Sequence, residues 1–154
     1  MQLEELTLGE KIALCQRAEL AVGSRLHLFA RLVDPEDEPL RQLLLDLASD
    51  EARRLVEIER LSAWAGTPAA TRLTPEELDH IVLDHFPSLS KSTGEGMIQR
   101  ESGTYLAQCL QEESVRLYRQ LAEHAGDGES RSFFLHWLRE GEWDIDFIRN
   151  VILT

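Results

Sequence analysis

The chain has 154 residues, of which 43% are hydrophobic, so it is long enough to bury one core and we expect a single domain over residues 1–154. Its formal net charge of −12 argues against binding to nucleic acid, whose phosphates require a basic surface, and against anionic membranes. No apolar run approaches the length of about 18 residues that a membrane span requires. Acidic residues stand near the N-terminus where a signal peptide needs basic ones, and the two cysteines are far apart. We therefore expect a cytoplasmic protein without disulfides.

Four long segments carry the hydrophobic period of an amphipathic helix. They cover about residues 7–33, 39–65, 97–124 and 129–152. Thr7 and Glu10 have the spacing of a capping box at the start of the first segment, and Gly66 follows the end of the second. No segment has the alternating pattern of a strand, so the sequence predicts an all-α fold.

The connection between the second and third predicted helices is long and contains the sequence TPEELDHIVLDHF. Thr74 and Glu77 form another capping-box pattern, which predicts a short helix there, and a loop is expected from Pro87 onward. Short, long and short connections between four helices are typical of a ferritin-like antiparallel four-helix bundle, with the long crossover between its second and third helices. An ordinary bundle with a loose loop is the alternative.

Each predicted helix has a glutamate near its midpoint, within the stripe of apolar residues that should face the core. These glutamates are Glu19, Glu51, Glu113 and Glu142, with Glu112 as the alternative to Glu113. At about 1.5 Å per residue, their offsets from the helix midpoints keep the four carboxylates within about 5 Å of one level. Ionised carboxylates are costly to bury alone, so protons, a cationic side chain or a metal ion must neutralise them. For any single glutamate the simpler interpretation is a boundary residue that reaches water.

Arg54 also falls within the stripe of the second helix, three residues after Glu51 and on the same helix face. We expect its guanidinium to contact at least one of the internal carboxylates and to compensate their charge. In the fourth helix the stripe is ambiguous, because Phe134, Trp137 and Gly141 define a neighbouring face.

The helices resemble those of the rubrerythrin branch of the ferritin-like di-iron carboxylate proteins. The matching stretches read AELAVGSRLHLFARL, ASDEARRL, EESVRLYRQLAE and LREGEWDIDFI. The family has a ligand glutamate on two of its helices and an E-x-x-H pair on each of the other two. The resemblance implies Glu19 and Glu113 as the single ligands, and Glu51 and Glu142 as the glutamates of the two pairs. Both histidines of the pattern are missing: Arg54 and Ile145 stand in their places.

Two functions follow from these observations. The glutamates and the resemblance favour an internal site for iron or another divalent metal, used in redox chemistry or iron handling; a site made of oxygens alone would suit magnesium, manganese or calcium. The missing histidines and Arg54 favour a metal-free bundle that binds a partner as a regulatory scaffold. We also expect a homodimer packed through helix faces, because a small acidic bundle is not expected to expose Trp64, Trp137 and Trp143 together.

Overall fold

The computed structural model describes residues 2–64, 72–91 and 96–152, and within these residues it contains helices and no strand. The elements are η1 (Leu3–Glu5), α1 (Leu8–Leu32), α2 (Glu38–Trp64), α3 (Pro75–His85), η2 (Pro87–Ser90), α4 (Arg100–Glu123) and α5 (Gly128–Ile152). The predicted all-α class is therefore confirmed. Among the described helices, none is long and apolar enough to cross a membrane.

Both capping boxes form as the sequence predicts. The amide of Glu10 donates to Thr7 Oγ1 at 3.1 Å and the amide of Thr7 donates to Glu10 Oε1 at 2.9 Å, which fixes the start of α1. Thr74 and Glu77 make the same reciprocal pair before α3, where Pro75 occupies the first turn. These side chains satisfy amide groups that have no partner within the helix.

The other helix boundaries differ from the predicted ones by a few residues. The fourth long segment begins at Gly128, and α4 begins at Arg100 rather than at Met97. The later start of α4 has a structural cause, because the amide of Ile98 donates to the carbonyl of Leu32 at 2.7 Å and so holds the preceding chain against the end of α1. The predicted end of the second helix at Ala65 and Gly66 lies outside the described residues.

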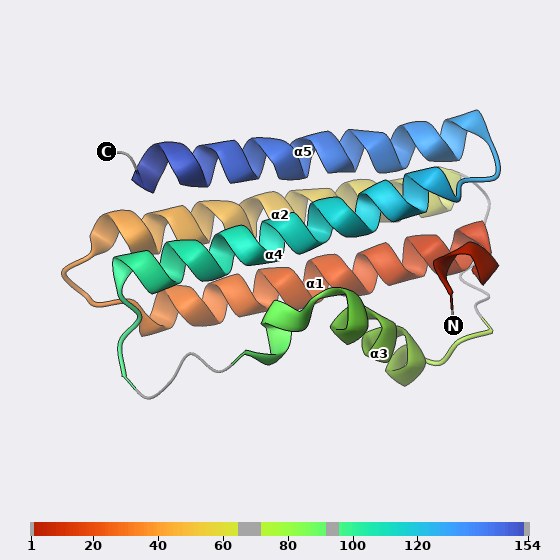
Figure 1. Ribbon diagram of the computed structural model, residues 1–154. Coiled ribbons are helices and arrows are strands. Elements are labelled where there is room, and N and C mark those ends of the chain that lie inside the picture. Colours follow the sequence, from red (N-terminus) through yellow and green to blue (C-terminus); the bar gives the residue numbers. More distant parts are fainter. Residues whose placement is uncertain (1, 65–71, 92–95, 153–154) are drawn as a thin grey trace.

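The four long helices lie side by side, and each of α1 and α4 packs chiefly against the helix that follows it, α2 and α5 respectively. In Figure 1 the chain runs from right to left along α1 and returns along α2. It then passes through α3, which packs on α1, before α4 runs from left to right again and α5 returns.

Most of the predicted apolar stripes are buried. In α1 and α2 the buried positions include the apolar residues on both sides of Glu19 and Glu51. In α5, however, the buried residues extend onto the neighbouring face. They include Phe134, Trp137, Gly141, Asp144 and Ile148, together with Leu138 and Ile145. A Cβ at Gly141 would lie 2.8 Å from Val115 Cγ2, so the absence of a side chain there allows α4 and α5 to approach closely.

Candidate functional site around Arg54

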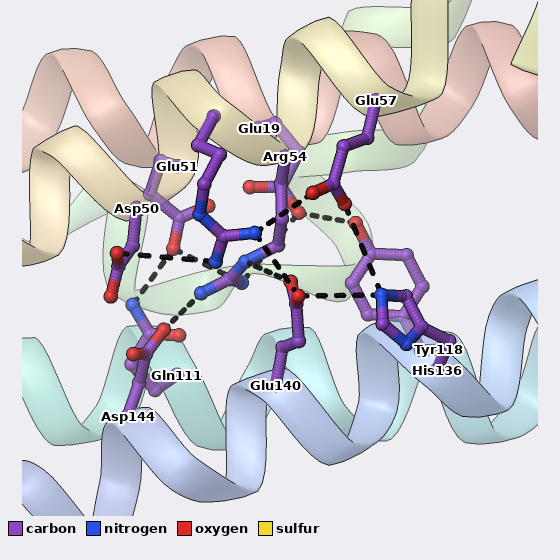
Figure 2. A network of polar contacts seen from close by, with 11 residues as sticks. Glu19, Asp50, Glu51, Arg54, Glu57, Gln111, Tyr118, His136, Glu140 and Asp144 are labelled. Atoms are coloured by element: carbon purple, nitrogen blue, oxygen red, sulfur yellow. Dashed lines mark hydrogen bonds and ion pairs between the residues drawn. The ribbon is translucent and has the colours of Figure 1, made fainter. Parts of the chain in front are cut away.

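Arg54 lies at the centre of a buried polar network and is itself 0% exposed. Its guanidinium Nη1 lies 3.5 Å from Glu51 Oε1 and 3.9 Å from Glu19 Oε1, and its Nε lies 3.3 Å from Glu140 Oε2. Its Nη2 donates a hydrogen bond to Asp144 Oδ2. Figure 2 shows Arg54 reaching between these acidic side chains, so that one guanidinium serves carboxylates from α1, α2 and α5.

The fourth long helix, α4, adds two uncharged groups to the network. Gln111 Nε2 donates to Glu51 Oε1 at 2.9 Å, and the Tyr118 hydroxyl donates to Glu19 Oε1. Both side chains are buried, and the Tyr118 ring packs against Trp137 of α5 with 5.8 Å between the ring centroids. These donors orient the carboxylates of Glu19 and Glu51 but bring no charge to neutralise them.

The network has more carboxylates than guanidinium groups. Burial raises the pKa of Glu51, against the opposing effect of Arg54, and burial likewise raises the pKa of Asp144 to about 7. Desolvation by burial lowers the pKa of Arg54, but Glu51 and Asp144 more than compensate, so its pKa lies above the ordinary value. The guanidinium therefore stays charged, while part of the carboxylate charge is cancelled by bound protons near neutral pH.

Several buried polar atoms of this network have no hydrogen-bond partner. They are Glu19 Oε2, Glu51 Oε2, Gln111 Oε1, Glu140 Oε2, and Nε and Nη1 of Arg54. The two arginine nitrogens lie at ion-pair distance from carboxylates without hydrogen-bond geometry. The oxygens of Glu19 and Glu51 are the atoms that could hold an additional proton, water molecule or cation, although any cation there would lie beside Arg54.

The structure brings together three of the residues that the sequence singled out. Glu19 and Glu51 are 3% and 1% exposed, and Arg54 lies within ion-pair distance of both. The expectation that Arg54 contacts at least one internal glutamate is therefore confirmed. Whether any of these residues binds a metal ion remains a prediction.

The two candidates on α4 lie apart from this network. Glu113 is buried, but its Oε1 accepts a hydrogen bond from the amide of Ser88 at 2.7 Å, so its carboxylate holds η2 against α4. Glu112 is half-buried and accepts from Gln108 Nε2 one turn earlier on the same helix, at 2.9 Å. The side chain of α4 that reaches Glu51 is instead Gln111.

The prediction that Glu142 points into the bundle is wrong, because Glu142 is exposed. Its place is taken by Asp144, which is 6% exposed, and by Glu140, one turn before Asp144 on α5. Glu142 has the helical spacing of Leu138 and Ile145, which are both buried, but the buried acid lies on the neighbouring stripe. Extending the spacing of Phe134, Trp137 and Gly141 by three residues would have led to Asp144.

Gln111, Glu140 and Asp144 are the functional candidates that sequence reasoning missed. The signal for Asp144 was the neighbouring face of α5. Gln111 carried no comparable signal, since a glutamine within a helix is usually a surface residue.

Comparison with known proteins finds no relative of this chain. No family model matches the chain, and neither the curated proteins nor the solved structures include a match. The site must therefore be interpreted from its own chemistry.

Proposed function

We propose that this protein is a ferritin-like four-helix bundle in which the Arg54 guanidinium takes the place of the metal ions of the di-iron carboxylate proteins. In this proposal the bundle acts as a scaffold for protein association and needs no metal in its core. The observation that carries the proposal is the position of Arg54, which is fully buried and within ion-pair distance of acids from three helices.

The course of the chain supports the ferritin-like part of this proposal. The second and fourth labelled helices, α2 and α4, run in the same direction, and the chain between them passes back along the molecule through α3 (Figure 1). A long crossover of this kind distinguishes ferritin-like connectivity from an up-and-down bundle, in which every connection is short.

Electrostatics favour arginine over metal as the internal cation. A divalent ion about 4 Å from a guanidinium is repelled by roughly 8 kcal/mol at an effective dielectric constant of 20. Among the described residues, no imidazole lies at ion-pair distance from Glu19 or Glu51, and α4 presents Gln111 rather than a carboxylate to them. A site with no imidazole ligand and a fixed positive charge at its centre is poorly suited to iron.

One observation favours the alternative function, an internal divalent-metal site. Glu19 Oε2 and Glu51 Oε2 are both buried and have no hydrogen-bond partner. If Arg54 moved away from them, these oxygens could ligate a hard cation, together with Asp144.

The exposed side of α5 supports association with a second copy of the chain. Trp143 is 75% exposed and Phe147, one turn later, is 43% exposed, whereas Trp137 is buried in the core. Aromatic residues are enriched at protein interfaces. We propose that the pair formed by Trp143 and Phe147 contributes to a homodimer, which light scattering of the parent and of Trp143→Ser would test through the loss of a dimer of about twice 17.6 kDa.

Anaerobic titration with ferrous iron tests the absence of a metal from the core. The titration is made on the His136→Gln variant, because His136 belongs to a separate cluster at the surface. The proposal predicts no stoichiometric iron binding to this variant and none to a further Glu19→Gln variant. Iron bound by the first variant and lost from the second, with both folded by circular dichroism, would instead establish the internal metal site.

A further inference from the structure

A second cluster of possible ligands lies beside the Arg54 network and is open to solvent. Glu57 of α2 and His136 and Glu140 of α5 each offer one ligand atom, and these three atoms lie within 4.8 Å of one another. His136 Nε2 is 3.3 Å from Glu140 Oε1 and 3.9 Å from Glu57 Oε2. We infer that Glu57, His136 and Glu140 form a binding site for a divalent transition-metal ion of the zinc type.

The distances fit the coordination chemistry of zinc. Zinc binds nitrogen and carboxylate oxygen at about 2.0–2.2 Å, so two ligands of a tetrahedral ion are about 3.3–3.5 Å apart. The spacing between His136 and Glu140 already has this value, and the 3.9 Å between His136 Nε2 and Glu57 Oε2 exceeds it by about half an ångström. Three protein ligands leave one position of the tetrahedron for water.

The positions of the three ligands on α2 and α5 bring their side chains together. His136 and Glu140 are four residues apart on α5, so their side chains leave the same face of the helix. The third ligand, Glu57, comes from α2, and Figure 2 shows it facing His136 across the two helices. An ion bound here would therefore cross-link two helices that are distant in sequence.

Arg53 is the group that an incoming ion must displace. Its Nη1 donates to Glu57 Oε1 at 2.9 Å and to Glu140 Oε1 at 3.1 Å. The Arg53 side chain is half-exposed, and the carboxylate of Asp50, 4.0 Å away, offers it another partner. Solvent screens the exposed ion pair between Arg53 and Glu57, so its loss costs little, and a bound ion would replace Arg53 as the cation beside Glu140.

Glu140 links this outer site to the network inside. One of its oxygens faces His136 and Arg53, and the other lies 3.3 Å from Nε of Arg54. The Glu140 side chain is only 14% exposed, so its position is set before an ion binds. The outer site does not depend on the proposed function, since it uses neither Glu19 nor Glu51.

The mixed donor set indicates which ions the site selects. A neutral imidazole with two carboxylates suits Zn²⁺ and Co²⁺, whereas Mg²⁺ and Ca²⁺ prefer oxygens alone. We therefore expect binding of Zn²⁺ and Co²⁺ in the presence of millimolar Mg²⁺.

The test is calorimetric titration of the untagged, chelator-treated chain with ZnCl₂, followed by optical titration with CoCl₂. We expect one ion per chain and an intense visible Co²⁺ spectrum, as tetrahedral coordination produces. His136→Gln should weaken binding at least tenfold, and Arg53→Gln should strengthen it because a competing cation is removed. The matched control is His124→Gln, since His124 is also exposed and lies 3.8 Å from a carboxylate, that of Glu4, but has no further ligand nearby among the described residues.

Two results would overturn the inference. One is the absence of Zn²⁺ and Co²⁺ binding by the folded parent at micromolar concentration. The other is binding that His136→Gln and His124→Gln reduce to the same extent, because adventitious surface histidines would then explain it. His136 is exposed, so its replacement is not expected to affect folding.

Discussion

Arg53 and Arg54 are neighbours in sequence but lie in opposite environments. The guanidinium of Arg53 is half-exposed and pairs with Glu57 and Glu140 at the surface, whereas that of Arg54 is fully buried and serves four acids. Glu140 contacts both arginines, one with each carboxylate oxygen. Solvent screens the charge of Arg53 but not that of Arg54, so we expect the protein to tolerate replacement of Arg53 and to be destabilised by replacement of Arg54.

The largest difference in stability should appear when Arg53 and Arg54 are replaced one at a time. Arg54→Ala leaves buried carboxylates without their cation and should lower the free energy of unfolding by about 3–5 kcal/mol. Arg53→Ala, the matched control, should lower it by at most about 1 kcal/mol. Urea denaturation followed by circular dichroism measures both, and equal losses for the two variants would show that Arg54 is not a buried ion-pair partner.

The inner network should also make stability depend on pH. The pKa of Asp144 is raised to about 7 in the folded protein by burial, above the ordinary value of 3.8, so the folded state retains a proton that the unfolded state loses. The stabilisation from this group is complete below pH 3.8 and is lost as the pH rises through 7. Between pH 4 and 7 we expect the contribution of Asp144 to the free energy of unfolding to fall by roughly 3 kcal/mol.

Asp144→Asn should remove this dependence, because the amide does not titrate. Denaturation at several pH values between 4 and 7 measures the effect as the difference between the parent and the variant. If the free energy of unfolding of the parent instead rose with pH relative to that of the variant, Asp144 would be ionised throughout this range, with a pKa lowered by Arg54.

Loss of the hydrogen bond from Tyr118 to Glu19 should have a smaller effect on stability. Tyr118→Phe removes the hydroxyl that donates to Glu19 and leaves that carboxylate with one partner fewer, which should cost about 1–3 kcal/mol. Tyr105 on the same helix is 62% exposed, so Tyr105→Phe should change the free energy of unfolding very little. Chemical denaturation of both variants checks this, and equal effects would contradict the assigned hydrogen bond.

The glutamates that lie apart from Arg54 should give the smallest effects. Glu113→Ala removes the acceptor of the Ser88 amide and should cost about 1 kcal/mol by loosening η2. Glu142→Ala removes an exposed side chain and should stay within about 0.5 kcal/mol. Thermal unfolding of both variants would show whether the order is reversed, as it would be if Glu142 faced the core.

The sequence predicted the helices better than it predicted the site. Capping boxes at Thr7 and Thr74 act locally, and the buried stripes of α1 and α2 are long and regular, so Glu19, Glu51 and Arg54 could be placed on the inner face. The stripe of α5 could be drawn along two neighbouring faces, and only packing against α4, with the close approach at Gly141, decides between them.

The polar partners on α4 were harder to foresee for a different reason. Glu113 and Gln111 are both buried, but on different sides of α4, one toward η2 and the other toward α2. Which of the two faces the centre depends on where η2 packs, and the sequence spacing of α4 does not contain that information. The pairing of Glu57 with His136 depends in the same way on how α2 and α5 come together.

The most direct test of the central claim, that Arg54 is the internal cation, is to exchange it for a metal ligand. In a His136→Gln background, which removes the outer histidine, Arg54→His with Gln111→Glu gives the network an imidazole and a further carboxylate. The measurement is the free energy of unfolding of this variant and of the His136→Gln background, with and without Fe²⁺ or Mn²⁺ under anaerobic conditions. We predict that the metal stabilises the exchanged variant, by about 2.7 kcal/mol at a metal concentration of 100 Kd, and leaves the background unchanged. Metal stabilisation of the background itself, abolished by Glu19→Gln, would contradict the account, because the core would then bind metal with Arg54 in place.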